Sequence, residues 1–210
     1  MNSEEELINS AINSYNSGNY ETSLINYNKI TELYPDSKEA YYNKGIVLQK
    51  MNKYQESLES FGKSLEIEND FIPSLLGKAL SLSIMNDKDN SLKIYDQIIS
   101  LDEKNWDAYI NKATILSELK KYDEALDCLD KLEKINLNEE IDNNEQSINI
   151  FNLEKKDIIN FIKGNILHQK GELNKAVELY NVILGADNNK NNEQVLINKG
   201  ICLLELNKLD

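Results

Sequence analysis

Apolar and polar residues between positions 40 and 70 alternate with the period of an α-helix. Two sets of apolar or small residues follow helical spacing, so each set occupies one face of a helix. The sets are Tyr41, Gly45 and Leu48, then Leu58, Phe61 and Leu65. A polar turn at Asn52 and Lys53 separates them. The stretch therefore predicts two amphipathic helices that pack as a hairpin.

A small residue recurs at this point of the first helix along the chain. Ala11, Gly45, Ala79 and Ala113 are separated by intervals of 34 residues. Gly164 and Gly200 continue the series after intervals of 51 and 36 residues, which indicates an insertion of 17 residues before Gly164. A small side chain is expected where two helices cross, because a larger one would hold their backbones apart. The chain is therefore expected to be an array of helical hairpins.

Turn and second-helix positions recur at the same interval. They are Gly18, Tyr20, Leu24 and Tyr27; Tyr54, Leu58 and Phe61; Leu92 and Tyr95; Tyr122, Ala125 and Leu126; and Gly171, Leu173, Ala176 and Tyr180. In this pattern the chain resembles the tetratricopeptide repeat family, whose 34-residue unit has a small residue in its first helix and an aromatic residue and an alanine in its second. Pro35 matches the proline that often ends the unit. Ser23, Ser57 and Ser91 replace the usual alanine, which we expect to affect packing and not the fold.

The resemblance implies an all-α fold, a right-handed α-solenoid of stacked antiparallel helix pairs. About five full tetratricopeptide repeats and a partial sixth are expected, in a single repeat domain over residues 1–210. The expected repeats are 4–37, 38–71, 72–105, 106–139, 157–190 and a partial 193–210, with an insertion at about 140–156. No stretch shows the strict alternation that is typical of a strand.

The periodicity predicts eleven helices. Their expected ranges are 3–17, 20–34, 37–51, 54–68, 71–85, 88–101, 105–119, 122–136, 146–169, 173–185 and 191–207. The helix at 146–169 is long because Ile148, Phe151, Ile158 and Ile162 continue one helical spacing out of the insertion. Such an extension would overhang the groove or pair with a neighbouring molecule. A surface loop is the alternative interpretation of the insertion.

The charge of the chain limits its partners. The 210 residues include 36 acidic and 23 basic side chains, a formal net charge of −13. This charge would repel a phosphate backbone, so we expect no nucleic acid and no membrane as partner, and instead a protein or peptide that is neutral to basic. The acidic start MNSEEELINS does not resemble a signal peptide, and no apolar run reaches the roughly 18 residues of a membrane span. A cytoplasmic protein is expected.

No set of residues predicts catalysis, a cofactor or a metal site. His168 is the only histidine, and no serine or cysteine is connected to it by a recognisable motif. Cys128 and Cys202 are far apart and lack a CxxC spacing, so they are interpreted as small core residues. We therefore expect no enzyme.

By resemblance, the concave surface formed by the first helices is the peptide-binding surface. Its twelve expected contacts are Asn9, Tyr42, Asn43, Ile46, Leu76, Leu80, Ile110, Asn111, Thr114, Phe161, Asn165 and Asn198, and Ile8, Ile12, Gln49, His168, Ile197 and Ile201 border them. An amide can pair with both the N–H and the C=O of an extended backbone. The surface is therefore expected to be apolar with spaced amides.

A lysine precedes the small residue in most units, at Lys44, Lys78, Lys112, Lys163 and Lys199. Two interpretations remain open: a row of cations that contacts a partner, or lysine stems that cover apolar surface while their charged ends reach water.

The last helix contains more apolar residues than one buried face needs, among them Ile201 and Leu204. The leading hypothesis is a scaffold that binds a peptide or helix of a partner protein. The alternative is a self-assembly module, either a homo-oligomer through the C-terminal helix or part of a longer repeat array.

Overall fold

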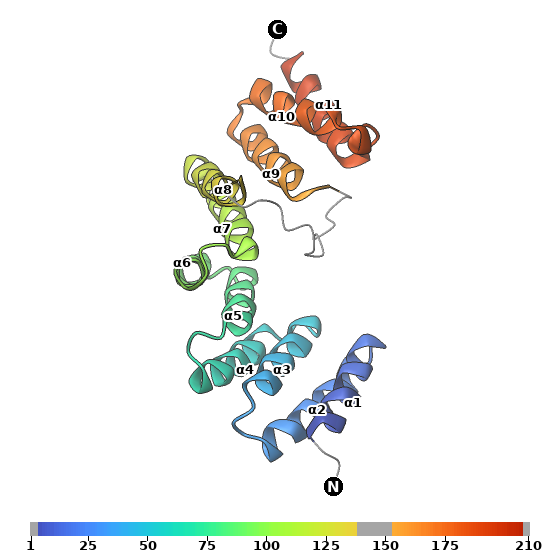
Figure 1. The fold of residues 1–210 in the computed structure, drawn as a ribbon, viewed down its shortest axis with the longest axis vertical. Helices are drawn as coiled ribbons and strands as arrows, with labels where there is room; N and C mark the ends of the chain where they lie inside the picture. The colour runs from blue at the N-terminus through green and yellow to red at the C-terminus, as the bar shows by residue number, and fades with distance from the viewer. Residues whose placement is uncertain (1–3, 138–152, 208–210) are drawn as a thin grey trace. The chain divides into compact units, whose positions relative to one another are not determined.

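The computed structural model describes residues 4–137 and 153–207, and these residues are helical almost throughout (Figure 1). They contain eleven α-helices, a 3-10 helix at Asp187–Asn189 and no strand, which confirms the predicted all-α class. The α-helices are α1 (Glu4–Asn16), α2 (Tyr20–Leu33), α3 (Lys38–Lys50), α4 (Tyr54–Ile67), α5 (Ile72–Ile84), α6 (Lys88–Leu101), α7 (Trp106–Glu118), α8 (Tyr122–Leu137), α9 (Lys155–Lys170), α10 (Leu173–Gly185) and α11 (Glu193–Leu206).

Ten of the predicted helices match these bounds within two residues at each end. The prediction of one helix over 146–169 is wrong at its start. Leu153 and Glu154 are not helical, and Glu154 is the extended N-cap residue of α9, with ψ at 158°. The helical spacing of Ile148 and Phe151 therefore does not continue without a break into α9, and residues 138–152 lie outside the described part of the chain.

The chain divides within α7 into two compact units, residues 1–108 (unit 1) and 109–210 (unit 2). In unit 1, each helix from α1 to α6 packs against the next one in sequence. In unit 2, α8, α9, α10 and α11 do the same (Figure 1). Helices that follow one another through short turns pack as antiparallel neighbours, as the repeat pattern predicts. The single repeat domain over 1–210 stays a prediction.

The turn inside each helix pair has the same backbone conformation. Five residues at the repeat interval have a positive φ: Gly18 (78°), Asn52 (59°), Asn86 (67°), Lys120 (61°) and Gly171 (87°). Glycine and asparagine adopt this left-handed region readily, whereas lysine does so at a cost. The repeat therefore requires the conformation, and Lys120 occupies it against its own preference.

In two of the helix pairs, the glycine at the small-residue position of the first helix faces an aromatic ring of the second helix. A Cβ atom added to Gly45 would lie 2.5 Å from the ring of Phe61, and one added to Gly164 would lie 2.6 Å from the ring of Tyr180. Phe61 also reaches the next repeat, since a Cβ atom on Gly77 would lie 2.4 Å from the same ring. The sequence analysis expected a small residue because two helix backbones cross there. At these glycines the space is instead occupied by an aromatic ring.

The serines that replace alanine make hydrogen bonds within the core. The Ser23 hydroxyl donates to the carbonyl of Ala11 (2.9 Å), and Ser91 donates to the carbonyl of Ala79 (2.7 Å). Ser57 is also buried, and its hydroxyl donates to the carbonyl of Tyr54 (3.0 Å). Burial of a hydroxyl is tolerated when a carbonyl accepts its hydrogen bond, so these serines preserve the alanine packing.

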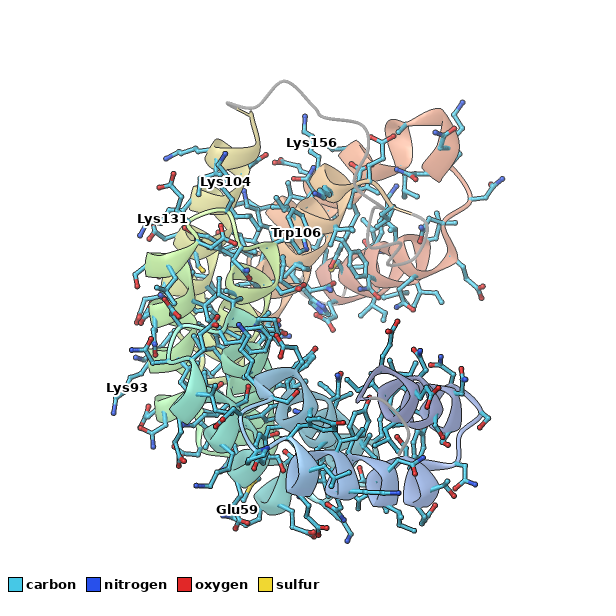
Figure 2. The ribbon with its side chains drawn as sticks, turned by 60° about the horizontal axis from the view of Figure 1, so that its bottom comes forward. Glu59, Lys93, Lys104, Trp106, Lys131 and Lys156 are labelled. Atoms are coloured by element: carbon cyan, nitrogen blue, oxygen red, sulfur yellow. The ribbon has the colours of Figure 1, made fainter. Side chains whose placement is uncertain are left out.

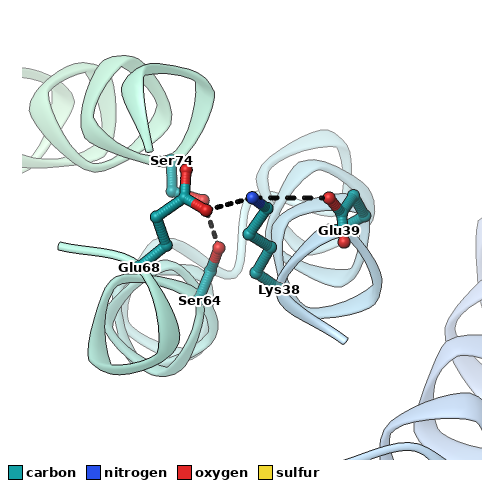
Figure 3. A network of polar contacts seen from close by, with 5 residues as sticks. All are labelled: Lys38, Glu39, Ser64, Glu68 and Ser74. Atoms are coloured by element: carbon teal, nitrogen blue, oxygen red, sulfur yellow. Dashed lines mark hydrogen bonds and ion pairs between the residues drawn. The ribbon is translucent and has the colours of Figure 1, made fainter. Parts of the chain in front are cut away.

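A polar network connects the start of α3 to the end of α4. The Lys38 ammonium lies between the carboxylates of Glu68 and Glu39 (Figure 3). The same ammonium is 4.9 Å from the centre of the Phe71 ring, at the N-cap of α5. Beside this ion pair, the Ser74 hydroxyl donates to the Ser64 hydroxyl at 2.7 Å. The network therefore joins three successive helices of unit 1.

Candidate functional site

The inner face of unit 1 is the candidate site, and we define it by seven residues of α1, α3 and α5. They are Asn9, Ile12, Tyr42, Asn43, Ile46, Leu76 and Leu80. Asn9 is exposed, Ile12 is 39% exposed and Leu80 is 43% exposed, while the other four are half-buried. The buried faces of the same helices carry Ala11, Ala40, Val47 and Ala79, all at 1% exposure or less. The face is therefore outside the core and mostly apolar.

Tyr42 is the most constrained side chain of this face. Its ring lies 6.1 Å from the ring of Phe61 and 5.9 Å from that of Phe71, perpendicular to the latter. Burial raises the pKa of the Tyr42 hydroxyl, and the nearby Tyr15 hydroxyl raises it further. Tyr15 and Phe71 were not among the expected site residues. Tyr15 lies in the last turn of α1 and Phe71 is the N-cap residue of α5. An aromatic residue at the end of a first helix is the feature of the sequence that could have identified them.

Two amides of this face have no partner among the described residues. No described residue forms a hydrogen bond with the side chain of Asn9 or Asn43. In contrast, the Gln49 amide donates to the Gly77 carbonyl and to the Ser81 hydroxyl, both at 2.8 Å. Gln49 thus connects α3 to α5, whereas the Asn9 and Asn43 side chains keep their donors and acceptors for solvent or a ligand.

In unit 2, α7 carries three of the expected contacts. Ile110 and Asn111 are half-buried and Thr114 is exposed. The Thr114 hydroxyl donates to the Ile110 carbonyl at 2.9 Å within the helix. The Asn111 side chain, like that of Asn43, has no hydrogen-bond partner among the described residues.

The expected contacts on α9 and α11 bond to one another. Asn165 Oδ1 accepts from the Tyr180 hydroxyl at 2.8 Å and from the Asn198 amide at 2.7 Å. His168 Nε2 is 3.0 Å from a carboxylate oxygen of Glu205. Phe161 is 6% exposed, with its ring centre 6.2 Å from that of Tyr180. The structure brings these residues together. The hydrogen bonds of Asn165 and Asn198 and the contact of His168 connect α9 to α10 and α11.

The recurring lysines lie on another side of the first helices. Lys163 is buried and pairs with Asp130 (2.5 Å) and Glu133 (2.6 Å) of α8. Burial lowers the pKa of its ammonium, but the hydrogen bonds to Asp130 and Glu133 outweigh this effect and the pKa is raised. Lys44 lines an outer cavity of about 260 Å³ together with Tyr41 and Lys63. For Lys163, the interpretation as a contact with a partner is wrong, because its charge is paired inside the repeat stack.

The remaining charges are distributed over the surface. Figure 2 shows Glu59 of α4 and Lys93 of α6 pointing away from the ribbon. Cys128 and Cys202 are buried and form no disulfide with each other, and the Cys128 thiol lies 3.6 Å from the Tyr109 carbonyl. In the described part of the chain, no group of three or more acidic, histidine or cysteine side chains could hold a metal ion. None of the described helices has the length and apolar character needed to span a membrane.

Comparison with known proteins agrees with this architecture. Sequence models described as tetratricopeptide repeat match residues 39–71, 72–105 and 94–127. A comparison with curated proteins found no match.

Solved structures with the same fold have little sequence in common with this chain. A tetratricopeptide repeat protein from Parabacteroides merdae ATCC 43184 has a TM-score of 0.71 at 15% identity, covering 98% of this chain and 78% of that one. YrrB, described as a TPR protein with an unusual peptide-binding site, has a TM-score of 0.63 at 18% identity and covers 96% of this chain and 90% of that one. The first TPR of Spaghetti (RPAP3), bound to the HSP90 peptide SRMEEVD, has a TM-score of 0.54 at 13% identity, with 56% and 95% covered.

At identities this low the solved structures establish the fold, and the sequence models establish the repeat within it. Together with the paired helices and the common turn conformation, they show that residues 39–127 of the chain consist of tetratricopeptide repeats.

Proposed function

We propose that the inner face of unit 1 binds a short segment of a partner protein. Arrays of this kind act as protein-interaction scaffolds, and their specificity lies in surface residues. The observation that carries the proposal is the Asn43 amide, which is half-buried, has no partner among the described residues, and lies one helical turn from Ile46 on the same helix. Two related structures are described with peptides or a peptide-binding site, which is consistent with this use of the fold.

The proposed contacts divide into two kinds. Ile12, Ile46, Leu76 and Leu80 supply partly exposed apolar surface that a partner would remove from water. Asn9 and Asn43 supply amides that can donate to a carbonyl and accept from an N–H of an extended backbone. Ile110, Asn111 and Thr114 are proposed as contacts of the same kind within unit 2. The bound segment is expected to be apolar and neutral to basic, since the chain has a net charge of −13.

A titration with matched controls tests the proposal. A peptide selected from a random library on the full chain is labelled, and its affinity is measured for Asn43→Ala and Leu80→Glu. Loss of one hydrogen bond, worth about 0.5–1.5 kcal/mol, predicts a weakening of roughly 2- to 10-fold for Asn43→Ala. A carboxylate at position 80 would be desolvated by the partner, so Leu80→Glu should weaken binding by more than about tenfold.

The controls change the same residue types away from this face. Asn69→Ala alters an exposed amide in the turn between α4 and α5, and Ile25→Glu alters an isoleucine of α2 that is 66% exposed. Neither should affect the affinity. If the controls weaken binding as much as the test variants do, or if neither test variant weakens it, the partner binds elsewhere.

Self-assembly is a second candidate function, and α11 supplies the observation that favours it. Ile197, Ile201 and Leu204 share one side of this helix and are 47%, 41% and 63% exposed. Exposed apolar patches of this kind are often association surfaces. Light scattering between low and high protein concentration tests the idea, and Leu204→Glu should abolish any dimer. A monomer at every concentration would exclude it.

A further inference from the structure

The side of α5 that belongs to the inner face of unit 1 is apolar along the whole helix. Four residues lie on this side at spacings of three and four, and we call them the α5 stripe: Pro73, Leu76, Leu80 and Ile84. Leu80 is 43% exposed and Ile84 is 50% exposed, while Pro73 and Leu76 are half-buried. From Pro73 to Ile84 the stripe extends over roughly 16 Å, about three helical turns.

The row of amides on the inner face ends at α5. Asn9 of α1 and Asn43 of α3 are separated by the repeat interval, and the same position of α5 is Gly77. Gly77 has no side chain to offer, and its carbonyl already accepts from the Gln49 amide at 2.8 Å. Ser83, which borders the stripe, carries a hydroxyl and no amide. α5 thus offers a partner apolar surface and little that could pair with a peptide backbone.

This difference decides which backbone conformation the α5 stripe favours. An extended segment has unpaired N–H and C=O groups, and burial of these groups against an apolar surface costs free energy for each group that finds no partner. A helix pairs its backbone groups internally, except for the N–H groups of its first turn and the C=O groups of its last turn. It also presents apolar side chains at spacings of three and four residues, as the stripe does. The stripe therefore favours a helical occupant.

We propose that the partner segment bound at the inner face of unit 1 is an amphipathic helix, which packs its apolar side along the α5 stripe. This inference rests on the proposed function and specifies the conformation of the bound segment. The amides of Asn9 and Asn43 lie on the two preceding first helices and can pair with the backbone groups left open at one end of the bound helix. The polar side of the bound helix is neutral to basic, because the chain has a net charge of −13. A second copy of this chain carries the same charge and is a poorer occupant.

Two peptide libraries of equal composition test which conformation is bound. Both consist of peptides of about 15 residues with the same leucines and lysines and with the other positions randomised. In the helical library the leucines recur at spacings of three and four, and in the strand library they occupy every second position. Selection on the full chain is followed by removal of peptides that also bind the Leu80→Glu chain. Binders are expected from the helical library, and a proline at the centre of the tightest one should weaken its binding more than about tenfold.

Fluorescence anisotropy of that labelled peptide then tests its position on α5. Ile84→Glu should weaken binding more than about tenfold, because the bound helix would desolvate a carboxylate at the end of the stripe. Leu101→Glu is the matched control, since Leu101 is 46% exposed and ends the second helix α6. It should leave the affinity unchanged. If Ile84→Glu lowers the helical circular dichroism signal, Ile84→Ala replaces it and should weaken binding severalfold through the loss of apolar contact.

Three results would overturn the inference. The first is the absence of any binder from the helical library up to about 1 mM, the weak limit of a specific complex. The second is equal or tighter binding by the strand library, or unchanged affinity after the central proline is introduced. The third is an equal affinity for the parent and Ile84→Glu chains, or a dimer of the chain that Ile84→Glu abolishes, since a second copy would then cover the stripe.

The peptide selected from the random library separates these failures from that of the proposed function. If it binds and requires Leu80 while the helical library yields nothing, the inner face of unit 1 binds a segment that is not helical, and only this inference fails. If its affinity is unaffected by both Asn43→Ala and Leu80→Glu, the proposed function fails as well.

Discussion

Phe61 should control how two neighbouring repeats of unit 1 are joined, and glycine-to-alanine variants can measure its role. Its ring is completely buried, and Cβ atoms at Gly45 and Gly77 would lie 2.5 Å and 2.4 Å from it. A ring that moves away from one added methyl group approaches the other helix. Both Gly45→Ala and Gly77→Ala should therefore overpack the same space, at a cost of about 1–3 kcal/mol.

The magnitude follows from two opposing effects. Alanine in place of glycine inside a helix stabilises by roughly 0.5–1 kcal/mol, so the net loss at Gly45 should be about 0.5–2 kcal/mol. Gly62 is the matched control, because it lies in α4 beside Phe61 and nothing is within 4 Å of its Cβ position. Gly62→Ala should stabilise by the helix-propensity gain alone. Gly45→Leu should destabilise far more than Lys44→Leu, which exchanges one partly exposed stem for another.

Urea unfolding followed by circular dichroism measures these changes, since a shift of midpoint at constant slope reports stability. A smaller side chain at position 61 should relieve the collision. Gly45→Ala combined with Phe61→Leu should therefore cost less than the sum of the two single changes. If Gly45→Ala raises the midpoint as much as Gly62→Ala does, the ring is not confined between the two glycines and the reasoning fails.

The remaining predictions concern the turns, the tyrosines and the binding surface. Lys120→Gly should raise the free energy of unfolding by about 0.5–1 kcal/mol, measured by urea unfolding, because Lys120 has φ at 61°. Lys131→Gly inside α8 should lower it. A lower free energy of unfolding for Lys120→Gly would contradict the argument. Burial raises the pKa of Tyr27 and of Tyr95 from 10.0 to about 12, so the folded state favours the neutral hydroxyls, and stability should be intact below pH 10 and decrease as the pH rises towards 12. Urea midpoints at pH 8 and pH 11 should differ less for Tyr95→Phe than for the parent chain, and an equal difference would assign the alkaline loss to other groups. Binding at the inner face of unit 1 should weaken by less than about tenfold between low and physiological salt, because its seven residues carry no formal charge, and a steeper dependence in titrations would indicate a charged site.

The sequence by itself determined the repeat and its secondary structure. A helix requires apolar residues on one face, and this local pattern was sufficient to place ten helices within two residues of their ends. The interval of 34 residues then identified the pairing of helices and the position of the small residue. Both conclusions depend on residues that are close in sequence, whose spacing alone decides which side of a helix they occupy.

Only the tertiary structure decided what each surface residue contacts. The sequence treated Asn43, Asn165 and Asn198 alike, but the last two bond to each other because α9 and α11 bring them within 2.7 Å, while Asn43 has no such neighbour. Lys163 was indistinguishable from the other recurring lysines until α8 placed two carboxylates beside it. In the sequence, α11 likewise had more apolar residues than one buried face needs, and nothing distinguished the buried ones from the exposed ones. Their separation into an exposed side, with Ile201 and Leu204, and a buried side, with Val195 and Cys202, depends on which neighbouring helices pack against α11, and the spacing within a single helix does not contain that information.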